Sequence, residues 1–305
     1  MNARIGFTRE LRDWVLHNVD RGVPPGPLAR NLAEQGFDLQ AAAAVVETLW
    51  SARACGKPLP QDGVDAGEVQ AARYRQEAPR LAAGSHIDAG DRQVRVALRI
   101  ERPVVAVLDG VFSPEECDAL VAAARPRLQP STLVDGSGRD VMSMARTSEG
   151  MFFRPRENAL LERIDRRLAR LMGLPPENGE GLQVLHYPAG AARSAPHFDF
   201  LMPTNAANQA SIARSGQRVS TLVAYLNDPE AGGETVFPEA GISVAPRKGC
   251  ALYFEYCNSA GQLDPLSLHA ALPVLAGEKW VATRWMRQRA FRTAGEVDGA
   301  PPNGA

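Results

Sequence analysis

The chain changes its pattern of apolar positions near residue 100. Before that point the large apolar residues recur at helical spacing in three short groups. The groups are Leu11, Trp14 and Val15, then Leu28 and Leu32, then Val45, Val46, Leu49 and Trp50. Prolines at 24, 25 and 27 separate the first two groups, Gly36 ends the second, and Asp38 caps the third. This pattern predicts a small helical module over residues 1–56.

A polar stretch with scattered glycine, proline and charged residues follows at 57–95 and predicts a linker, with a helix inside 66–82. From Pro103 the segment VVAVLDGVF predicts a strand. The next segment, SPEECDALVAAA, predicts a helix, because Ser113 is placed as N-cap, Pro114 as first helical residue and Glu116 as the partner in a capping box. Leucine spacing predicts a further helix over about 157–172.

After Gly181 the pattern becomes one of short apolar runs divided by turn residues, which is typical of strands. The runs are LQVLHY, PHFDF, RVSTLVAYLN, ETVFP, ISVAP, CALYFEY, LSLHAA and KWVATRWMRQ. Many short strands with Gly/Pro-rich turns favour a sandwich or jelly roll. We expect a mainly β fold with flanking helices: a domain over 96–292 with its β core at about 181–291, and a disordered tail at 293–305.

Composition narrows the functional classes. The chain has 45% hydrophobic and 23% charged residues and a formal net charge of −1, so no bulk field favours nucleic acid or an anionic membrane. No apolar run is long enough to span a bilayer. The four cysteines form no CxxC pair and read as reduced thiols, which leads us to expect a cytoplasmic protein.

The segment PHFDF carries the candidate chemistry. Alternate residues of a strand face the same side, so His197 and Asp199 would point together. An HxD pair alone is common by chance, but His269 in LSLHAA offers a third ligand, whereas His17, His86 and His186 read as structural or exposed. Two histidines and one carboxylate leave three adjacent metal positions open, as in non-haem Fe(II) oxygenases. A 2-oxo acid can fill two of these and dioxygen the third.

The last long run could hold the far carboxylate of 2-oxoglutarate. Lys279, Val281, Thr283 and Trp285 share one face of the strand if it alternates regularly. A buried carboxylate needs a cation and hydrogen bonds, so Lys279 could pair with the C5 carboxylate beside an aromatic wall from Trp285. Thr235 and Tyr187 could add hydroxyl groups, although each taken singly is more often structural.

At this point residues 103–288 resemble the prolyl 4-hydroxylase family of 2-oxoglutarate dioxygenases. The matching pieces, in order, are FSPEECDALV, ARTSEGMFF, EGLQVLHY, PHFDF, RVSTLVAYLND, GGETVFPE, APRKGCALYFEY, DPLSLHAALPVLAGEKW and ATRWMR. The resemblance implies a double-stranded β-helix core and Fe(II), 2-oxoglutarate and O2 as requirements, with ascorbate as a protectant. Relatives often have an aromatic residue where this chain has Ser194.

The resemblance also implies residue roles. Iron would be bound by His197, Asp199 and His269, and the C5 carboxylate by Lys279 with Thr235 and Tyr187, Trp285 lying at the co-substrate boundary. The substrate channel would be lined by Arg146, Ser148, Glu180 and Arg218. The polar segment 201–217, between Asp199 and Arg218, is placed to act as a mobile lid.

Several functions remain open from the sequence. The first is hydroxylation of a proline-containing peptide or protein, and the second is hydroxylation of a free amino acid or other small molecule. A closed pocket would favour the small molecule and an open channel the peptide. A jelly-roll binding protein without catalysis, and a zinc hydrolase at the same triad, are the remaining alternatives. The N-terminal helices are a candidate surface for protein interaction.

Overall fold

The computed structural model describes residues 4–130, 132–134, 140–142, 148–191 and 194–293. Across this part of the chain there are seven α-helices, whose bounds are α1 Arg9–Asp20, α2 Pro25–Glu34, α3 Leu39–Ala54, α4 Ala66–Ala72, α5 Pro114–Ala124, α6 Ala159–Leu171 and α7 Ala206–Ser215. None of the helices described has both the length and the apolar character that a membrane span needs. The tail predicted to be disordered lies outside the described residues from 294 onward.

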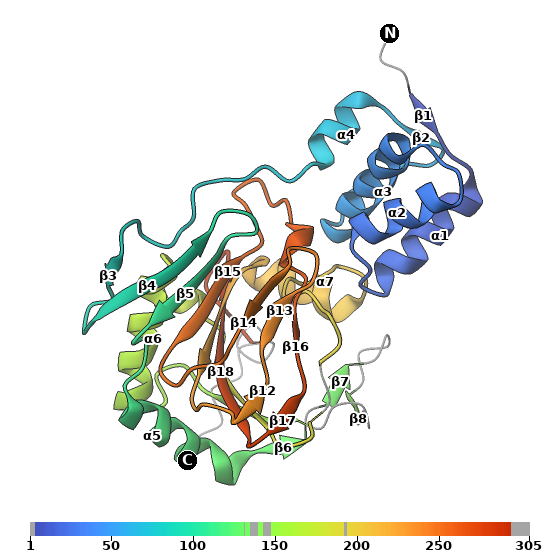
Figure 1. Ribbon diagram of the computed structural model, residues 1–305. Coiled ribbons are helices and arrows are strands. Elements are labelled where there is room, and N and C mark those ends of the chain that lie inside the picture. Colours follow the sequence, from blue (N-terminus) through green and yellow to red (C-terminus); the bar gives the residue numbers. More distant parts are fainter. Residues whose placement is uncertain (1–3, 131, 135–139, 143–147, 192–193, 294–305) are drawn as a thin grey trace.

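A nine-stranded antiparallel sheet forms the centre of the fold, in the order β3-β4-β5-β15-β11-β18-β10-β9-β6 (Figure 1). Its strands are β3 His86–Asp88, β4 Gln93–Ile100, β5 Val105–Asp109, β6 Gln129–Pro130, β9 Glu149–Phe153, β10 Leu182–Tyr187, β11 Arg218–Tyr225, β15 Ala251–Glu255 and β18 Lys279–Arg287. A three-stranded sheet is formed by β13 Thr235–Phe237, β14 Ile242–Val244 and β16 Ala270–Ala271. It lies in front of the main sheet in Figure 1.

Three further strand pairs complete the description. They are β1 Ile5–Gly6 with β2 Gly63–Val64, β7 Thr132–Val134 with β8 Asp140–Met142, and β12 Ala231–Gly232 with β17 Val274–Ala276. Two facing antiparallel sheets with helices outside them form the double-stranded β-helix, so the predicted fold class is confirmed.

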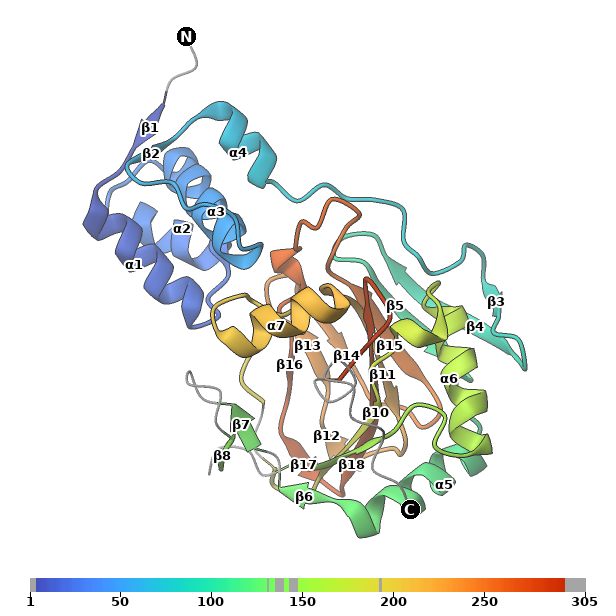
Figure 2. The same ribbon diagram turned by 180° about the vertical axis from the view of Figure 1, so that it is seen from behind.

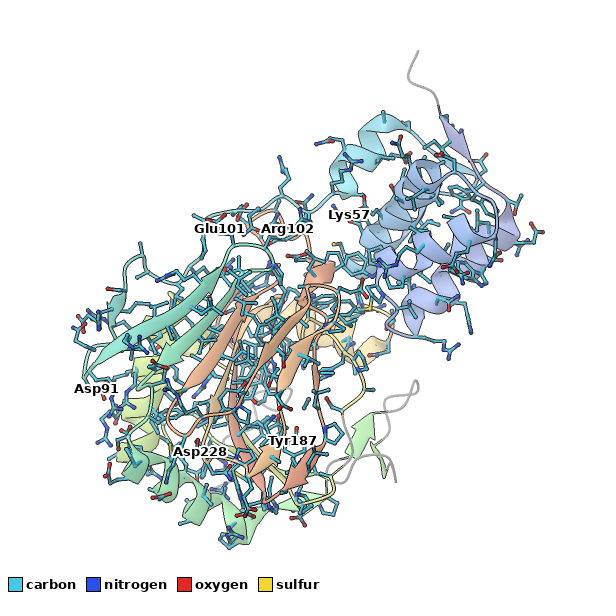
Figure 3. All side chains as sticks on the ribbon, viewed as in Figure 1. Lys57, Asp91, Glu101, Arg102, Tyr187 and Asp228 are labelled. Atoms are coloured by element: carbon cyan, nitrogen blue, oxygen red, sulfur yellow. The ribbon has the colours of Figure 1, made fainter. Side chains whose placement is uncertain are left out.

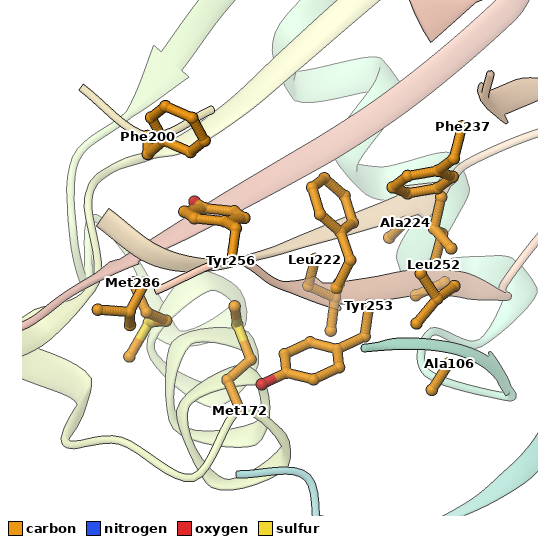
Figure 4. Packing of buried hydrophobic residues seen from close by; sticks show 14 of the residues in the cluster. Ala106, Met172, Phe200, Leu222, Ala224, Phe237, Leu252, Tyr253, Tyr256 and Met286 are labelled. Atoms are coloured by element: carbon orange, nitrogen blue, oxygen red, sulfur yellow. The ribbon is translucent and has the colours of Figure 1, made fainter. Parts of the chain in front are cut away.

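Helices α5 and α6 cover the outer face of the main sheet (Figure 2). The capping box predicted at Ser113 and Glu116 begins α5. On this outer face Tyr253 and Leu222, which pair across β15 and β11, lie near Met172 at the end of α6, while Tyr256 and Phe237 lie on the opposite side (Figure 4). Packing of this apolar outer face against α5 and α6 holds the main sheet in place, so the inner face of the sheet can line a cavity.

The three predicted N-terminal helices are confirmed as α1, α2 and α3, and Asp38 caps α3 by accepting a hydrogen bond from the Ala41 N–H. The linker predicted for 57–95 extended too far, because β3 and the start of β4 already belong to the main sheet. Strand β4 lies second from one edge of the main sheet. The sequence held a usable strand signal there, because apolar residues occupy alternate positions, Val94, Val96, Leu98 and Ile100.

The strand predicted at PHFDF is wrong, since only His197 forms a β-bridge, to His269. Segment 201–217, which was predicted to act as a lid, contains helix α7, whose N-cap Asn205 accepts a hydrogen bond from the Asn208 N–H. Its role as a lid stays a prediction. Arg287 donates to the carbonyl groups of Ser211 and Gly216, so the helix is anchored to the main sheet. The segment lacks an apolar stripe, but its Asn cap followed by alanines was a usable helix signal.

Candidate active site

His197, Asp199 and His269 converge as predicted, and their ligand atoms all lie within 4.8 Å of one another. Asp199 Oδ1 is 3.8 Å from His197 Nε2, and Asp199 Oδ2 is 3.7 Å from His269 Nε2. The reciprocal backbone hydrogen bonds between His197 and His269, of 2.9 and 3.1 Å, bring the two imidazoles together. The donor set is two imidazole nitrogens and one carboxylate, which fits a ferrous ion with open coordination positions.

Both imidazoles are oriented by backbone carbonyl groups. His197 Nδ1 lies 3.0 Å from the Ala195 carbonyl oxygen and His269 Nδ1 lies 3.0 Å from that of Ser267. With the proton on Nδ1, each Nε2 presents its lone pair to the shared centre. Burial lowers the pKa of His269 to about 4, and the Asp199 carboxylate opposes this shift. His269 is therefore neutral at physiological pH, the state in which it can bind a metal.

The Asp199 carboxylate is buried, and hydrogen bonds from neighbouring side chains hold this residue in place. The Thr221 hydroxyl donates to Asp199 Oδ2 at 2.7 Å, and the Tyr256 hydroxyl lies 3.0 Å from the same Thr221 oxygen. Arg218 Nη1 donates to the Asp199 carbonyl group at 3.1 Å. Burial acts to raise the pKa of Asp199, but the facing histidines and Arg218 lower it on balance. The carboxylate is thus ionised and fixed in place.

Lys279 is buried on β18, 3% exposed, and belongs to the same cavity. Its Nζ donates to the Gly233 carbonyl group at 2.6 Å and lies 5.7 and 5.6 Å from the ring centres of Tyr187 and Tyr225. Gly233 has a φ of +77°, and a Cβ there would meet the lysine Cδ at 3.1 Å. Burial lowers the pKa of Lys279 to about 8, while Glu234 acts to raise it. No carboxylate of the described residues forms an ion pair with this buried ammonium group, which is therefore suited to an anionic ligand.

Thr235 lies at the same end of the cavity, on β13. The Tyr225 hydroxyl donates to Thr235 Oγ1 at 3.0 Å, which leaves the threonine proton directed elsewhere and able to donate to a ligand. Tyr187 pairs with Lys279 across β10 and β18 and can be followed at the lower end of the barrel in Figure 3. Lys279, Thr235 and Tyr187 therefore gather as the sequence predicted.

A single cavity of about 870 Å³ connects the triad and Lys279. All four predicted cavity residues of β18, Lys279, Val281, Thr283 and Trp285, line it. The apolar side chains of Leu185 and Val223 also contribute to the wall. The volume is that of a ligand pocket and far exceeds what a metal ion requires. The cavity reaches the surface near Phe152, which is 53% exposed.

Comparison with known proteins decides the family. The model of the 2OG-Fe(II) oxygenase superfamily matches residues 182–287. Prolyl 4-hydroxylase 1 of Arabidopsis thaliana is 44% identical over 204 residues, which cover 62% of this chain and 70% of that protein. Probable prolyl 4-hydroxylase 3 of the same plant is 36% identical over 248 residues, covering 75% and 83%. The chain belongs to the prolyl 4-hydroxylase family.

Among solved structures, the viral collagen prolyl hydroxylase of Paramecium Bursaria Chlorella virus-1 is 29% identical, with a TM-score of 0.47, and the match covers 60% of this chain and 95% of the viral chain. As a 2OG-Fe(II) oxygenase, the protein is a dioxygenase that uses Fe(II), 2-oxoglutarate and O2. The donor set at the triad and the ammonium group of Lys279 fit these requirements. The alternatives of a non-catalytic binding protein and a zinc hydrolase are thereby set aside.

The structure places the four predicted substrate residues of this protein differently. Arg146 lies outside the described residues. Ser148 is buried and lines the cavity, as does Arg218. Glu180 does not line the cavity, because it lies behind Arg218 and accepts hydrogen bonds from Arg218 Nε and Nη2 and from Arg287 Nη1, at 2.7 to 2.9 Å. A direct substrate contact by Glu180 is therefore not supported.

Trp285 also differs from its predicted place. It lies six positions after Lys279 on β18, which is roughly 20 Å along a strand. It packs instead under the Arg218 guanidinium, 4.2 Å from the ring centre, near Asp199. The period-2 pattern placed Trp285 correctly on the cavity face but carried no information about the end of the cavity to which it belongs. Trp285 therefore borders the metal and substrate end of the site.

Sequence reasoning missed several residues that position the site. Thr221 and Tyr225 face inward from β11, where the polar or aromatic side chain alone gave no sign of its partner. Ser194, identified only as a departure from the family pattern, accepts a hydrogen bond of 2.7 Å from the Ala271 N–H and lines the cavity. It thus ties the segment before His197 to the strand after His269.

Proposed function

We propose that this dioxygenase hydroxylates a prolyl residue of a peptide or protein, with His197, Asp199 and His269 binding Fe(II) and Lys279 binding the C5 carboxylate of 2-oxoglutarate. The observation that carries the proposal is the single cavity in which an open His/Asp/His donor set and a buried ammonium group face the same space. When bound, iron would activate dioxygen, and the co-substrate would supply two electrons to that dioxygen as it is oxidatively decarboxylated to succinate and carbon dioxide.

The residues of the chain orient and shield this chemistry. Lys279 supplies the charge that binds the C5 carboxylate, and Thr235, aligned by Tyr225, supplies a hydroxyl donor beside it. Leu185, Val223 and Val281 form an apolar wall that excludes water from the co-substrate. Thr221 and Arg218 hold Asp199 so that the carboxylate keeps its place as the cavity fills.

Several observations support a prolyl peptide as the substrate. The curated relatives are prolyl 4-hydroxylases. The cavity also opens beside exposed positions, Gln129, Pro130 and Phe152, where a chain longer than one amino acid can enter. Trp285, with Arg218 stacked on it, gives the metal end an aromatic surface suited to a pyrrolidine ring. Ser148 is a polar contact on the same side.

Mass spectrometry of a panel of proline-containing peptides, together with free proline, tests the proposal. Purified protein is supplied with Fe(II), 2-oxoglutarate and O2, with and without ascorbate. We expect one peptide class to gain the mass of a single oxygen atom, with succinate formed in equal amount. Oxidation of free proline alone, with every peptide unchanged, would contradict the peptide proposal and favour the small-molecule alternative.

A further inference from the structure

The segment that carries His197 and Asp199 receives little support from the backbone ladder. Only His197 is bridged, and residues 198–201 belong to no strand. Metal ligands on irregular backbone must be held by side-chain contacts if their geometry is to persist. Arg218 and Thr221 provide such contacts on the side of Asp199 that faces β11. The other side of the segment is supported from outside the β-helix.

Two aromatic side chains alternate with the ligands along this segment. Phe198 and Phe200 stack on each other with ring centres 4.5 Å apart, and Phe198 contributes to the cavity wall. Trp50 of helix α3 packs edge-on against both, at 5.9 Å from Phe198 and 6.1 Å from Phe200. Trp50 is 3% exposed. The N-terminal module therefore covers the back of the metal-binding segment directly.

The contacts continue from this aromatic cluster to the carboxylate. Phe200 lies 6.0 Å from Tyr256, and the two rings can be seen one above the other in Figure 4. The Tyr256 hydroxyl contacts Thr221, which donates to Asp199. A contiguous path of packed rings and two hydrogen bonds thus joins α3 to a metal ligand.

The module is seated closely at this place. A Cβ at Gly56 would meet Pro203 Cγ at 3.1 Å, so the chain leaving α3 touches the segment that follows Phe200. Cys55 Sγ lies 3.5 Å from the Gly261 carbonyl oxygen, and Arg30 pairs with Glu239 at 3.4 Å. Lys57, labelled in Figure 3, marks this junction. The N-terminal module therefore contacts the β-helix domain at several separate segments, which indicates a defined interface between them.

We propose that the N-terminal module is part of the catalytic unit, and that Trp50 is a positioning residue that holds His197 and Asp199 in place through Phe198 and Phe200. This inference rests on the proposed iron site. It assigns the module a role different from an independent docking surface. Trp50 acts through its ring alone, because nothing in the described part of the chain accepts a hydrogen bond from its indole N–H.

Calorimetric titration with Co(II), which replaces the oxidisable ferrous ion, tests the proposal on the full chain. We expect Trp50→Ala to weaken Co(II) binding by about tenfold, the lower end of the loss seen when outer partners of metal ligands are changed. Trp50→Phe keeps an aromatic ring, although a smaller one, and loses the unpartnered N–H, so it should recover most of the affinity. The visible absorption spectrum of bound Co(II) should change in Trp50→Ala and return in Trp50→Phe.

Leu32→Ala is the matched control, because Leu32 is buried in the module but belongs to none of these aromatic contacts. It should lower the melting temperature and leave Co(II) affinity unchanged. Equal losses in Leu32→Ala and Trp50→Ala, or unchanged affinity and spectrum in a folded Trp50→Ala protein, would overturn the inference. If Trp50→Ala does not fold, Trp50→Leu replaces it, because leucine fills part of the space without an aromatic ring, and a Co(II) affinity equal to that of Leu32→Ala would then overturn the inference. Failure of the wild type to bind Co(II) would instead count against the iron site itself.

Discussion

The two ends of the cavity are built in different ways. Lys279 stands on β18, which is hydrogen-bonded on both sides, to β10 and β11. His197 and Asp199 lie on a segment with one β-bridge, and their positions depend on side chains from β11, from Tyr256 directly after β15, and from helix α3. Backbone hydrogen bonds between strands therefore hold the co-substrate end in place. The metal end is held by side-chain hydrogen bonds and ring contacts, which single substitutions can remove.

The largest expected effect comes from removing a metal ligand. His269→Ala should reduce succinate formation by more than about a hundredfold, because losing a ligand costs more than losing an outer partner of one. His86→Ala, an exposed histidine on β3, is the control and should keep full activity. Succinate formation at the wild-type rate in His269→Ala would show that the metal end is misassigned.

The buried ion pairs behind Arg218 give the next effect. Burial acts to raise the pKa of Glu180, but Arg218 and Arg287 lower it on balance. Its ionised form therefore stabilises the fold above the usual glutamate pKa, and this contribution is lost as pH falls through the lowered value. Glu180→Gln should cost about 3 kcal/mol of unfolding free energy at neutral pH, because two guanidinium groups lose their partner. Denaturant unfolding measures the loss.

The difference between Glu180→Gln and the wild type should shrink in acid, where Glu180 itself becomes protonated. A difference that is the same at neutral and acid pH would contradict the assignment. Because Arg218 also donates to the Asp199 carbonyl group, the variant should bind Co(II) more weakly, whereas its lysine end should be unaffected. Weaker Co(II) binding with unchanged 2-oxoglutarate binding would show that the metal end and the co-substrate end of the cavity are held independently.

A pH titration addresses the co-substrate end. Burial lowers the pKa of Lys279 to about 8, so the free enzyme carries the ammonium charge below that pH and loses it above. The KM for 2-oxoglutarate should rise toward tenfold for each pH unit above about 8. Steady-state kinetics at saturating iron and peptide measures it. A KM that falls as pH rises would be inconsistent with an ammonium group at the C5 carboxylate.

The smallest effect is expected from Tyr225→Phe. Its hydroxyl orients Thr235, so the variant should lose about 1 kcal/mol of co-substrate binding, a factor of about five. Calorimetry with 2-oxoglutarate gives the value, and Co(II) affinity serves as the internal control that should not change. An equal loss of metal affinity would mean that the two ends are coupled more strongly than their construction suggests.

The same contrast explains what the sequence could predict. The four cavity residues of β18 follow from strict alternation on a regular strand, and the cap of α5 follows from Ser113 and Glu116. The triad was predicted from a strand at PHFDF that the structure does not contain. The ligands nevertheless converge, because the β-bridge at His197, the bend after it and the side-chain contacts place His197 and Asp199 on the same side. The residue assignment therefore succeeded although its structural premise was wrong.

What could not be predicted depends on contacts between distant segments. Trp50 reads as one more apolar residue on α3, and nothing local relates it to Phe198 or Phe200. Tyr225 and Thr221 gain their roles only when β11 faces Thr235 and Asp199. Strand β4, by contrast, was predictable, because its apolar residues occupy alternate positions, Val94, Val96, Leu98 and Ile100.

The most direct test of the central claim compares two 2-oxo acids on the Co(II)-loaded protein. 2-Oxovalerate retains the chelating end of 2-oxoglutarate but lacks the C5 carboxylate. By calorimetry, Lys279→Met should bind 2-oxoglutarate at least about tenfold more weakly than the wild type, since a charge-assisted hydrogen bond is lost. Its affinity for 2-oxovalerate should be unchanged. Equal losses for both acids, or no loss for either, would contradict the account.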